Sequence, residues 1–187
     1  MSRRPHIQQR RRFYVGCEGQ SEGGYVARLQ PLCDAEGLHV HLDIDAFPAG
    51  VGDPLDRVSA ALRRSVARAR IRGAYRARFV FLDSDQAIAS PQRGADARRE
   101  ATQAGLILIW QETCHEALLL RHLNGHQARR PVDTPSAVRS LTQAWPNYAK
   151  PMDAVALSSR IDRYAVLRAA SVEPELANFL RTLGWTI

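Results

Sequence analysis

The chain has 187 residues, 45% of them hydrophobic, which is enough for one domain with a buried core. Its three cysteines, Cys17, Cys33 and Cys114, form no CxxC motif and no even set for disulfides, which favours a reducing, cytoplasmic environment. The longest apolar run, residues 106–110, is too short to cross a bilayer, and no apolar run of signal-peptide length follows the basic N-terminus, so no membrane partner is expected.

The formal net charge of +7 is carried almost wholly by arginine, because Lys150 is the only lysine. This excess favours a polyanionic partner such as nucleic acid or a nucleotide, and the alternative is a solvated arginine surface. Residues 1–12 contain little apolar surface and predict a flexible basic arm. Two roles stay open for this arm: solubility alone, or contact with phosphate groups through Arg10, Arg11 and Arg12.

The first predicted elements alternate between strand and helix. Residues 13–17 form a short apolar strand, and a helix begins near Gln20 or Ser21, with Ser21 as a candidate cap. Gly37 is placed to end this helix. Residues 38–46 alternate apolar and polar side chains, which predicts a half-exposed strand near a sheet edge.

The remaining elements continue this alternation. Asp53 and Pro54 form an N-cap and first-turn pair for a helix over residues 54–71. Further strands are predicted at 78–82 and 106–110, and further helices at 91–104, around 116–120, and at 135–144, 151–169 and 173–183. This order predicts a mostly parallel, four-stranded α/β sheet flanked by helices, in a single domain over 13–187 with a helical C-terminal extension from about residue 134.

Two acidic motifs directly follow two of the apolar strands. Glu18 and Glu22 come after the strand at 13–17, and Asp83 and Asp85 come after the strand at 78–82. The carboxyl ends of parallel strands meet at one edge of a sheet, where ligands bind. The sequence therefore predicts that these four carboxylates lie close together in the fold.

Carboxylates that crowd together raise each other's pKa, and a hard divalent cation with oxygen ligands removes that cost. Gly19 allows a tight strand-to-helix turn that brings backbone N–H groups near a phosphate or a metal. Asp83 and Asp85, two residues apart, would point the same way from an extended backbone. In the alternative interpretation Glu18 only caps a helix and the two aspartates begin a loop.

Two weaker motifs are not expected to carry chemistry. Cys114 and His115 are neighbours in a predicted helix and do not face each other, so they form no catalytic dyad. Two histidine pairs lack cysteine ligands at zinc-finger spacing and are interpreted as surface or supporting residues. These pairs are His39 with His41 and His122 with His126.

The combination of Glu-Gly after the first strand with Asp-x-Asp after a later one resembles a Toprim domain, the catalytic module of topoisomerases, primases and certain nucleases. Over most of residues 13–170 the chain resembles the RloB-like family of bacterial Toprim proteins, which is tied to phage defence and abortive infection. In the third segment that carries the resemblance, Thr113 replaces the family's usual proline and His115 an aromatic residue, while Glu116 is retained. The segments are 15–22 (VGCEGQSE), 79–85 (FVFLDSD), 113–120 (TCHEALLL) and 147–150 (NYAK).

The resemblance implies a Toprim/Rossmann-like fold and a site that binds Mg²⁺ or Mn²⁺. Glu18 would correspond to the general acid/base, with a share in metal binding, and Asp83 and Asp85 to the metal-binding pair. Glu22 and Glu116 would be further metal ligands or orienting groups. The bound ion would activate water and neutralise the scissile phosphate.

Three further residues take roles from the same resemblance. Lys150 falls where the family often has Tyr-x-Lys, and a lysine acts as a point-charge phosphate binder, so it is a candidate catalytic residue; a surface lysine is the alternative. Ser21 and His122 are candidate supporting residues behind the ligands. The number of metal ions and the oligomeric state stay open.

The expected function is a Mg²⁺- or Mn²⁺-dependent nuclease that cleaves phosphodiester bonds in RNA, tRNA included, or in DNA, as an effector of bacterial antiviral defence. Relatives are often encoded with an ATPase, so a partner ATPase is expected to control it; this chain has no GxxxxGK[ST] motif. One alternative is a non-cleaving module that binds nucleic acid or a nucleotide and signals to a partner. Another is a primase-like phosphotransferase, for which 187 residues leave little room.

Overall fold

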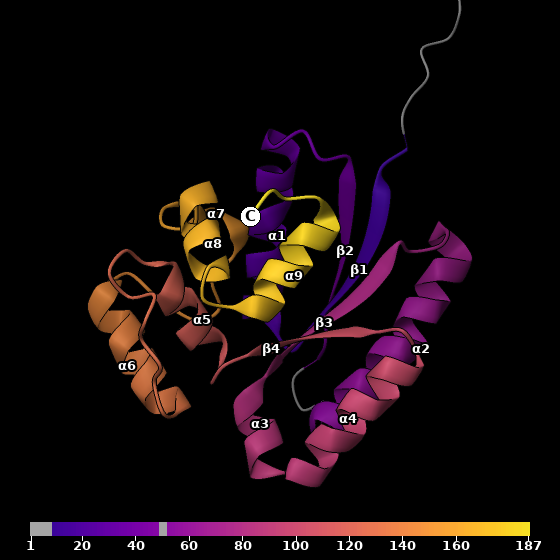
Figure 1. The fold of residues 1–187 in the computed structure, drawn as a ribbon, viewed down its shortest axis with the longest axis horizontal. Helices are drawn as coiled ribbons and strands as arrows, with labels where there is room; N and C mark the ends of the chain where they lie inside the picture. The colour runs from indigo at the N-terminus through magenta and orange to yellow at the C-terminus, as the bar shows by residue number, and fades with distance from the viewer. Residues whose placement is uncertain (1–8, 49–51) are drawn as a thin grey trace, which may run out of the picture.

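Four parallel strands form the centre of the molecule, in the spatial order β2-β1-β3-β4 (Figure 1). The computed structural model describes residues 9–48 and 52–187, and within them every strand pairing is parallel. The predicted parallel, Rossmann-like α/β architecture is therefore confirmed, with β2 at an edge as its alternating sequence indicates. The strands are β1 (Arg11–Cys17), β2 (Val40–Ala46), β3 (Ala77–Asp83) and β4 (Ile107–Gln111).

Helices cover both faces of the sheet (Figure 1). Phe13 and Val15 of β1 pack toward α1 and the C-terminal helices, whereas Tyr14 between them packs toward α2 and α4. Burial on both faces explains why the strands read as continuous apolar runs. The helices are α1 (Gln20–Ala35), α2 (Pro54–Arg72), α3 (Ser84–Ala89), α4 (Pro91–Gln103), α5 (His115–His122), α6 (Thr134–Ala144), α7 (Ala154–Ser158), α8 (Arg163–Ala170) and α9 (Pro174–Leu183).

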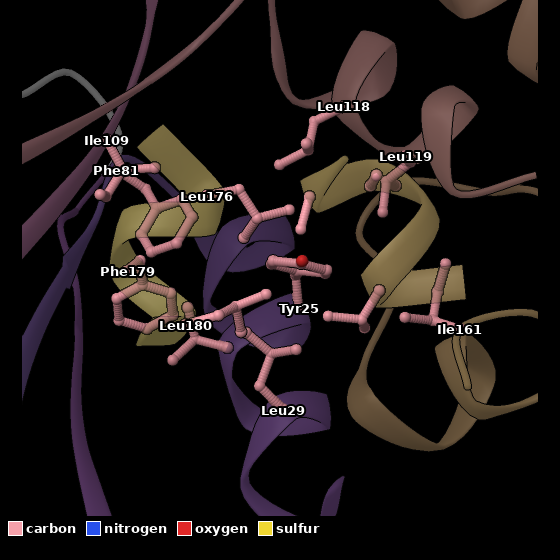
Figure 2. Close-up of a cluster of buried hydrophobic side chains, with 14 of the residues drawn as sticks. Tyr25, Leu29, Phe81, Ile109, Leu118, Leu119, Ile161, Leu176, Phe179 and Leu180 are labelled. Atoms are coloured by element: carbon pink, nitrogen blue, oxygen red, sulfur yellow. The ribbon is translucent and has the colours of Figure 1, made fainter. Parts of the chain in front are cut away.

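The larger hydrophobic core joins the sheet to the C-terminal helices (Figure 2). Phe179 of α9 packs edge-on against Phe81 of β3, with ring centroids 5.4 Å apart, and Tyr25 and Leu29 of α1 belong to the same cluster. The C-terminal helices therefore share one core with the sheet. None of the helices in the described ranges is long and apolar enough to cross a membrane.

The element boundaries confirm some predictions and correct others. Asp53 caps α2 as predicted, because its carboxylate accepts the Leu55 N–H at 3.0 Å. Ser21 does not cap α1; the N-cap is Gly19, and it makes no side-chain cap hydrogen bond. Gly37 follows the end of α1 with a φ of +69°, the left-handed conformation that glycine adopts most easily.

Two further predictions about elements are wrong, and one helix was not predicted. The helix expected over 151–169 is two helices, α7 and α8, because Asp162 begins a second helix by accepting the Ala165 N–H at 2.8 Å. α3 was not predicted, since its six residues are too few to show a hydrophobic period. The basic arm is shorter than predicted: β1 begins at Arg11, so Arg11 and Arg12 belong to the sheet, and residues 1–8 lie outside the described range.

Asp43 and Asp45 on the polar side of β2 are buried rather than exposed, which corrects that part of the prediction, whereas His41 on the same side is exposed as predicted. Asp43 and Asp45 are 4% and 2% exposed. Arg68 of α2 lies 2.7 Å from Asp43 and 2.8 Å from Asp45, and Arg64 also pairs with Asp45. Arginines from a neighbouring helix therefore cover the acidic face that the alternating sequence assigned to solvent.

Candidate metal centre

The order of the sheet places the two acidic motifs side by side. β1 lies between β2 and β3, so the chain leaves β1 toward one side and later returns to its other side. In open parallel sheets, ligands bind at the carboxyl ends of strands where the order reverses in this way. Glu18 follows β1 and Asp83 ends β3, and the Asp83 N–H donates to Glu18 Oε2 at 2.9 Å.

Glu18 is held from two more directions by residues that the sequence did not single out. Arg57 Nη1 of α2 lies 2.8 Å from Glu18 Oε1, and Gln86 Nε2 of α3 donates to the same oxygen at 3.0 Å. Arg57 also donates to Gln86 at 2.6 Å, so the two groups hold each other in place. Burial raises the pKa of Glu18; the Asp83 N–H and Arg57 act against this rise, and Glu22 and Asp85 add to it. A buried carboxyl with a raised pKa suits proton transfer near neutral pH.

Asp83 carries the strongest electrostatic signal of the site. Burial, together with the negative charges of Glu18, Glu22, Asp85 and Glu116, raises its pKa to about 9. Burial is the largest cause, and the charges that add to it belong to carboxylates close to Asp83. We refer to these five residues as the acidic cluster.

A buried polar chain orients Asp83 from behind. Gln111 Nε2 at the end of β4 donates to Asp83 Oδ1 at 3.2 Å, and Gln111 Oε1 lies 2.6 Å from His115 Nδ1. Gln111 and His115 are 1% and 0% exposed. Neither was predicted as a site residue, because only their contacts in space connect them to the acidic motif. Groups behind a ligand fix its direction in this way in many metal sites.

Asp85 joins the cluster by a route different from the one predicted. β3 ends at Asp83 and α3 begins at Ser84, so the two aspartates do not share an extended backbone and that part of the prediction is wrong. The Asp85 N–H donates to Thr113 O at 3.1 Å, and Thr134 Oγ1 at the start of α6 donates to Asp85 Oδ2 at 2.8 Å. α3 and α6 therefore place Asp85 close enough for its charge to contribute to the raised pKa of Asp83.

Glu116 and Lys150 form the other wall of the site. Lys150 Nζ lies 2.7 Å from Glu116 Oε1, and the Tyr148 hydroxyl donates to the same oxygen at 3.1 Å. Burial acts to raise the pKa of Glu116, but the hydrogen bond and charge of Lys150 outweigh it and lower that pKa to about 2. Burial acts to lower the pKa of Lys150, and Glu116, Glu22 and Asp83 together raise it. Lys150 is thus a stable cation directed at the acidic cluster.

A glycine in α1 brings the Lys150 segment to the cluster. A Cβ at Gly24 would lie 2.1 Å from the backbone oxygen of Met152, a contact that no side chain tolerates. Only glycine lets the backbone after Lys150 pass this close to the first turns of α1. The same helix carries Glu22, so the close approach sets the spacing between the acid and the lysine.

The other predicted residues fall both inside and outside the site. Glu22 is buried in the first turn of α1, and a Cβ at Gly19 would lie 3.3 Å from its Oε2, so the turn at Gly19 does adjoin the cluster. Ser21 is buried in the same turn. His122 is fully buried against Tyr25, whose hydroxyl lies 3.0 Å from His122 Nε2, and burial lowers its pKa to about 4. His122 is therefore a neutral part of the core that supports α5.

The three predicted phosphate-binding arginines lie elsewhere in the structure. Arg10, Arg11 and Arg12 stand at the amino end of β1, whereas Glu18 follows its carboxyl end. Arg11 donates to Leu183 O at 2.8 Å, and Arg12 pairs with Asp43 at 2.9 Å. These arginines therefore lie away from the acidic cluster, and their contact with phosphate groups stays a prediction.

The structure also argues against Cys114 as a catalytic thiol. Cys114 is fully buried, and burial raises the pKa of its thiol to about 12. A thiol with so high a pKa holds its proton at neutral pH and is a poor nucleophile. Cys17, Cys33 and Cys114 are all free and buried.

The acidic cluster fits a hard cation by its chemistry and its charge. Asp85 Oδ1 and Glu116 Oε2 are buried and have no hydrogen-bond partner within the described ranges. Unpartnered buried carboxylate oxygens are costly, and oxygen is the ligand that Mg²⁺ and Mn²⁺ prefer. As the side chains stand, no three described His, Cys, Asp or Glu residues converge on one point that would hold a metal ion. The donors are therefore suitable in kind, but they do not form a finished coordination sphere.

Comparison of the chain with protein-family models, with curated proteins and with solved structures found no match in any of the three. The case for a function therefore rests on the geometry and electrostatics of the site. Two facts carry most weight: acids from four elements meet at the reversal point of a parallel sheet, and only part of their charge is compensated.

Proposed function

We propose that the protein is a Mg²⁺- or Mn²⁺-dependent nuclease of the RloB-like, Toprim type, which hydrolyses phosphodiester bonds in RNA or DNA. The observation that carries the proposal is a group of buried acids whose negative charge is only partly balanced. Asp83 has a raised pKa, and Asp85 and Glu116 each keep one carboxylate oxygen without a hydrogen-bond partner within the described ranges. A divalent cation would balance this charge. The lysine directed at the same cluster adds the positive charge that a phosphate group needs.

Each residue has a distinct role in the proposed reaction. Asp83, Asp85, Glu22 and Glu116 would hold the cation, which supplies charge neutralisation and a more acidic water when bound. Glu18, fixed by Arg57, Gln86 and the Asp83 N–H, would take the proton of the attacking water.

Two positively charged side chains, Lys150 and Arg57, would complete the site on the substrate side. Lys150 would bind an oxygen of the scissile phosphate and stabilise the charge that develops there. In the structure Lys150 is paired with Glu116. Arg57 lies on the opposite wall, 2.8 Å from Glu18, and would orient Glu18 while its charge attracts the same phosphate. A metal held between a lysine and an arginine is well suited to a phosphodiester rather than to an uncharged substrate.

A second candidate function is a module that binds nucleic acid or a nucleotide without cleaving it and signals to a partner. The ion pairs of Glu18 with Arg57 and of Glu116 with Lys150 favour it, because they occupy one oxygen of each acid. In either case a partner ATPase would supply the nucleotide-dependent control that this chain does not carry in a GxxxxGK[ST] motif.

Cleavage assays separate the two functions. The purified protein, alone and with an ATPase encoded beside it, is incubated with tRNA, other RNA and DNA in Mg²⁺, Mn²⁺ or EDTA, together with Glu18→Ala and Asp83→Asn variants. The nuclease predicts cleavage that needs the metal and both acids. Asp96→Asn, a partly exposed acid on α4 that pairs with Arg99, is the matched control and should cleave as well as the wild type. Cleavage that continues in EDTA, or binding without cleavage under every condition, would overturn the nuclease.

A further inference from the structure

A second charged feature lies at the opposite end of the sheet from the acidic cluster. A cavity of about 680 Å³ opens at the amino ends of β1 and β3, and its walls include the C-terminal end of α2. We refer to it as the basic cavity. The arginines of its lining are Arg10, Arg11, Arg12, Arg72 and Arg76, and His41 also lines it.

The basic cavity keeps an excess of positive charge. Among the residues that the structure describes, no acidic side chain lines it. Arg11 donates to an uncharged partner, the Leu183 carbonyl. Arg76 is exposed and makes no ion pair or side-chain hydrogen bond within the described ranges. Arg12 and Arg72 both reach Asp43, a single carboxylate that Arg68 also shares. Arg10 pairs with Asp34 at 3.1 Å, so the five arginines of the lining outnumber the two carboxylates that they contact. An excess of guanidinium groups around a hollow attracts phosphate groups.

The walls of the basic cavity are held in place. Arg12 Nη1 donates to the Gly73 carbonyl at 2.9 Å, and its guanidinium lies over the Tyr75 ring, 4.8 Å from the centroid. The Tyr75 hydroxyl in turn donates to Asp43 at 2.5 Å. A guanidinium fixed in this way loses little side-chain freedom when an anion binds.

α2 connects the basic cavity with the acidic cluster. Arg57 near its start contacts Glu18, and Arg72 at its end lines the cavity. At 1.5 Å per residue these two positions are about 22 Å apart along the helix axis. Between them Arg64 and Arg68 have side chains 44% and 28% exposed. The spacing of four residues from Arg64 to Arg68 and on to Arg72 is about 6 Å per step, close to the separation of successive phosphates in a nucleic-acid strand.

We propose that the basic cavity is a binding site for the backbone phosphates of the nucleic-acid substrate, reached along the arginine face of α2 from the acidic cluster. The inference rests on the proposed function, and it adds that the substrate is a strand of several nucleotides rather than a mononucleotide. Phosphates several nucleotides from the scissile bond occupy the basic cavity, and the acidic cluster holds the scissile phosphate.

Binding measured in EDTA tests this without any cleavage. Fluorescence anisotropy of a labelled single-stranded RNA follows the wild type, the Arg72→Gln/Arg76→Gln variant, and a control that removes two exposed arginines outside the cavity, Arg139→Gln/Arg160→Gln. The cavity variant is expected to bind at least tenfold more weakly, and its slope of log affinity against log salt should be shallower by about 1.4, since each lost phosphate contact on a single strand contributes about 0.7. The control should lose less than threefold.

Further variants and ligands distinguish binding at the basic cavity from binding at the acidic cluster. Asp83→Asn should keep the full binding contribution of the basic cavity even when it cleaves nothing, so a failed nuclease leaves this test intact. RNA long enough to span α2 should bind the wild type more tightly than RNA too short to span it, because only the longer strand reaches both the cavity and the arginines of α2. Arg76→Gln alone, at an exposed position, checks that any loss is not a folding defect. Equal losses in cavity variant and control, no loss in either, or competition by inorganic phosphate as effective as that by RNA would overturn the proposal.

Discussion

The chain contains two Asp-x-Asp motifs, and the structure gives them opposite electrostatic environments. Asp43 and Asp45 lie within β2, buried but surrounded by arginines of α2 and by tyrosine hydroxyls. Burial acts to raise their pKa values, yet these partners outweigh it and lower both. Asp83, at the end of β3, has a pKa raised to about 9, because burial and four neighbouring acids are not balanced. Identical motifs are thus a structural ion-pair network in one place and a candidate metal centre in the other.

The difference comes from position along the strand. A motif inside a strand faces a helix packed on the sheet. The arginines of α2 lie at positions along the helix from which they reach Asp43 and Asp45. A motif at the carboxyl end faces the edge of the sheet, where the next helix begins. Uncompensated charge in the folded state is therefore the feature that separates a binding site from a structural network.

Replacing Asp83 gives the largest expected effect on function and should leave the fold intact. Asp83→Asn is expected to lower the rate of cleavage by at least about 10³-fold, because it removes a ligand of the cation. It should leave the metal-free protein at least as stable as the wild type, since the folded wild type must keep a proton on Asp83 at neutral pH, whereas the unfolded chain releases it. Cleavage rates and urea denaturation in EDTA measure the two effects. Clear destabilisation would show that Asp83 is compensated like Asp45.

Replacing Asp45 should have the opposite consequence. Asp45→Asn is expected to lower the free energy of unfolding by about 3 kcal/mol, because Arg64, Arg68 and Tyr14 all lose a charged partner. The figure is at the low end for buried pairs because Arg64 is 44% exposed and can turn to water. Urea denaturation at neutral pH measures it. A loss below about 0.5 kcal/mol, the scale of an ordinary surface substitution, would contradict the network.

Lys150 tests the compensated half of the acidic cluster. Lys150→Met is expected to slow cleavage by about 10²-fold, the usual loss when one transition-state donor is removed. It should also raise the pKa of Glu116 from about 2, since Lys150 is the main group that lowers it. Lys150→Arg, which keeps the charge, should retain more activity than Lys150→Met. Equal activity of wild type and Lys150→Met would make Lys150 a surface residue.

The pH dependence of stability should separate the two motifs in metal-free protein. The folded state holds a proton on Asp83 that the unfolded chain releases near pH 4, so this contribution is complete below pH 4 and is lost as the pH rises toward about 9. Asp43 and Asp45 have lowered pKa values, so their contribution is present above pH 4 and is lost as the pH falls. Denaturation midpoints from pH 3 to 9 test this, and Asp83→Asn should flatten only the decline at high pH. An unchanged decline in that variant would assign it to other groups.

Much of the fold could be predicted from the sequence because strand length, helix period and caps are local. The pair Asp53-Pro54 and the glycine after α1 fixed helix ends that the structure confirms. The acids of the site could be predicted because parallel strands end together. Arg57, Gln86 and Gln111 could not, since each reaches the cluster from another element and no local pattern marks it.

The largest errors have the same physical origin. The exposed face assigned to β2 depended on arginines eighteen or more residues away, which reverse the expected burial of Asp43 and Asp45. The prediction of an extended backbone from Asp83 to Asp85 was wrong because α3 begins at Ser84. This helix of six residues is too short to show a hydrophobic period in the sequence.

Calorimetric titration of Mn²⁺ into metal-free protein tests the central claim most directly, because it needs neither substrate nor partner. Wild type and the Asp96→Asn control should bind Mn²⁺ with the same affinity, and Asp83→Asn should bind it at least tenfold more weakly. Asp45→Asn, at a temperature where it remains folded, should bind like the wild type. Wild type that binds no Mn²⁺, or Asp83→Asn that binds it undiminished, would contradict the assignment of the acidic cluster as a metal centre.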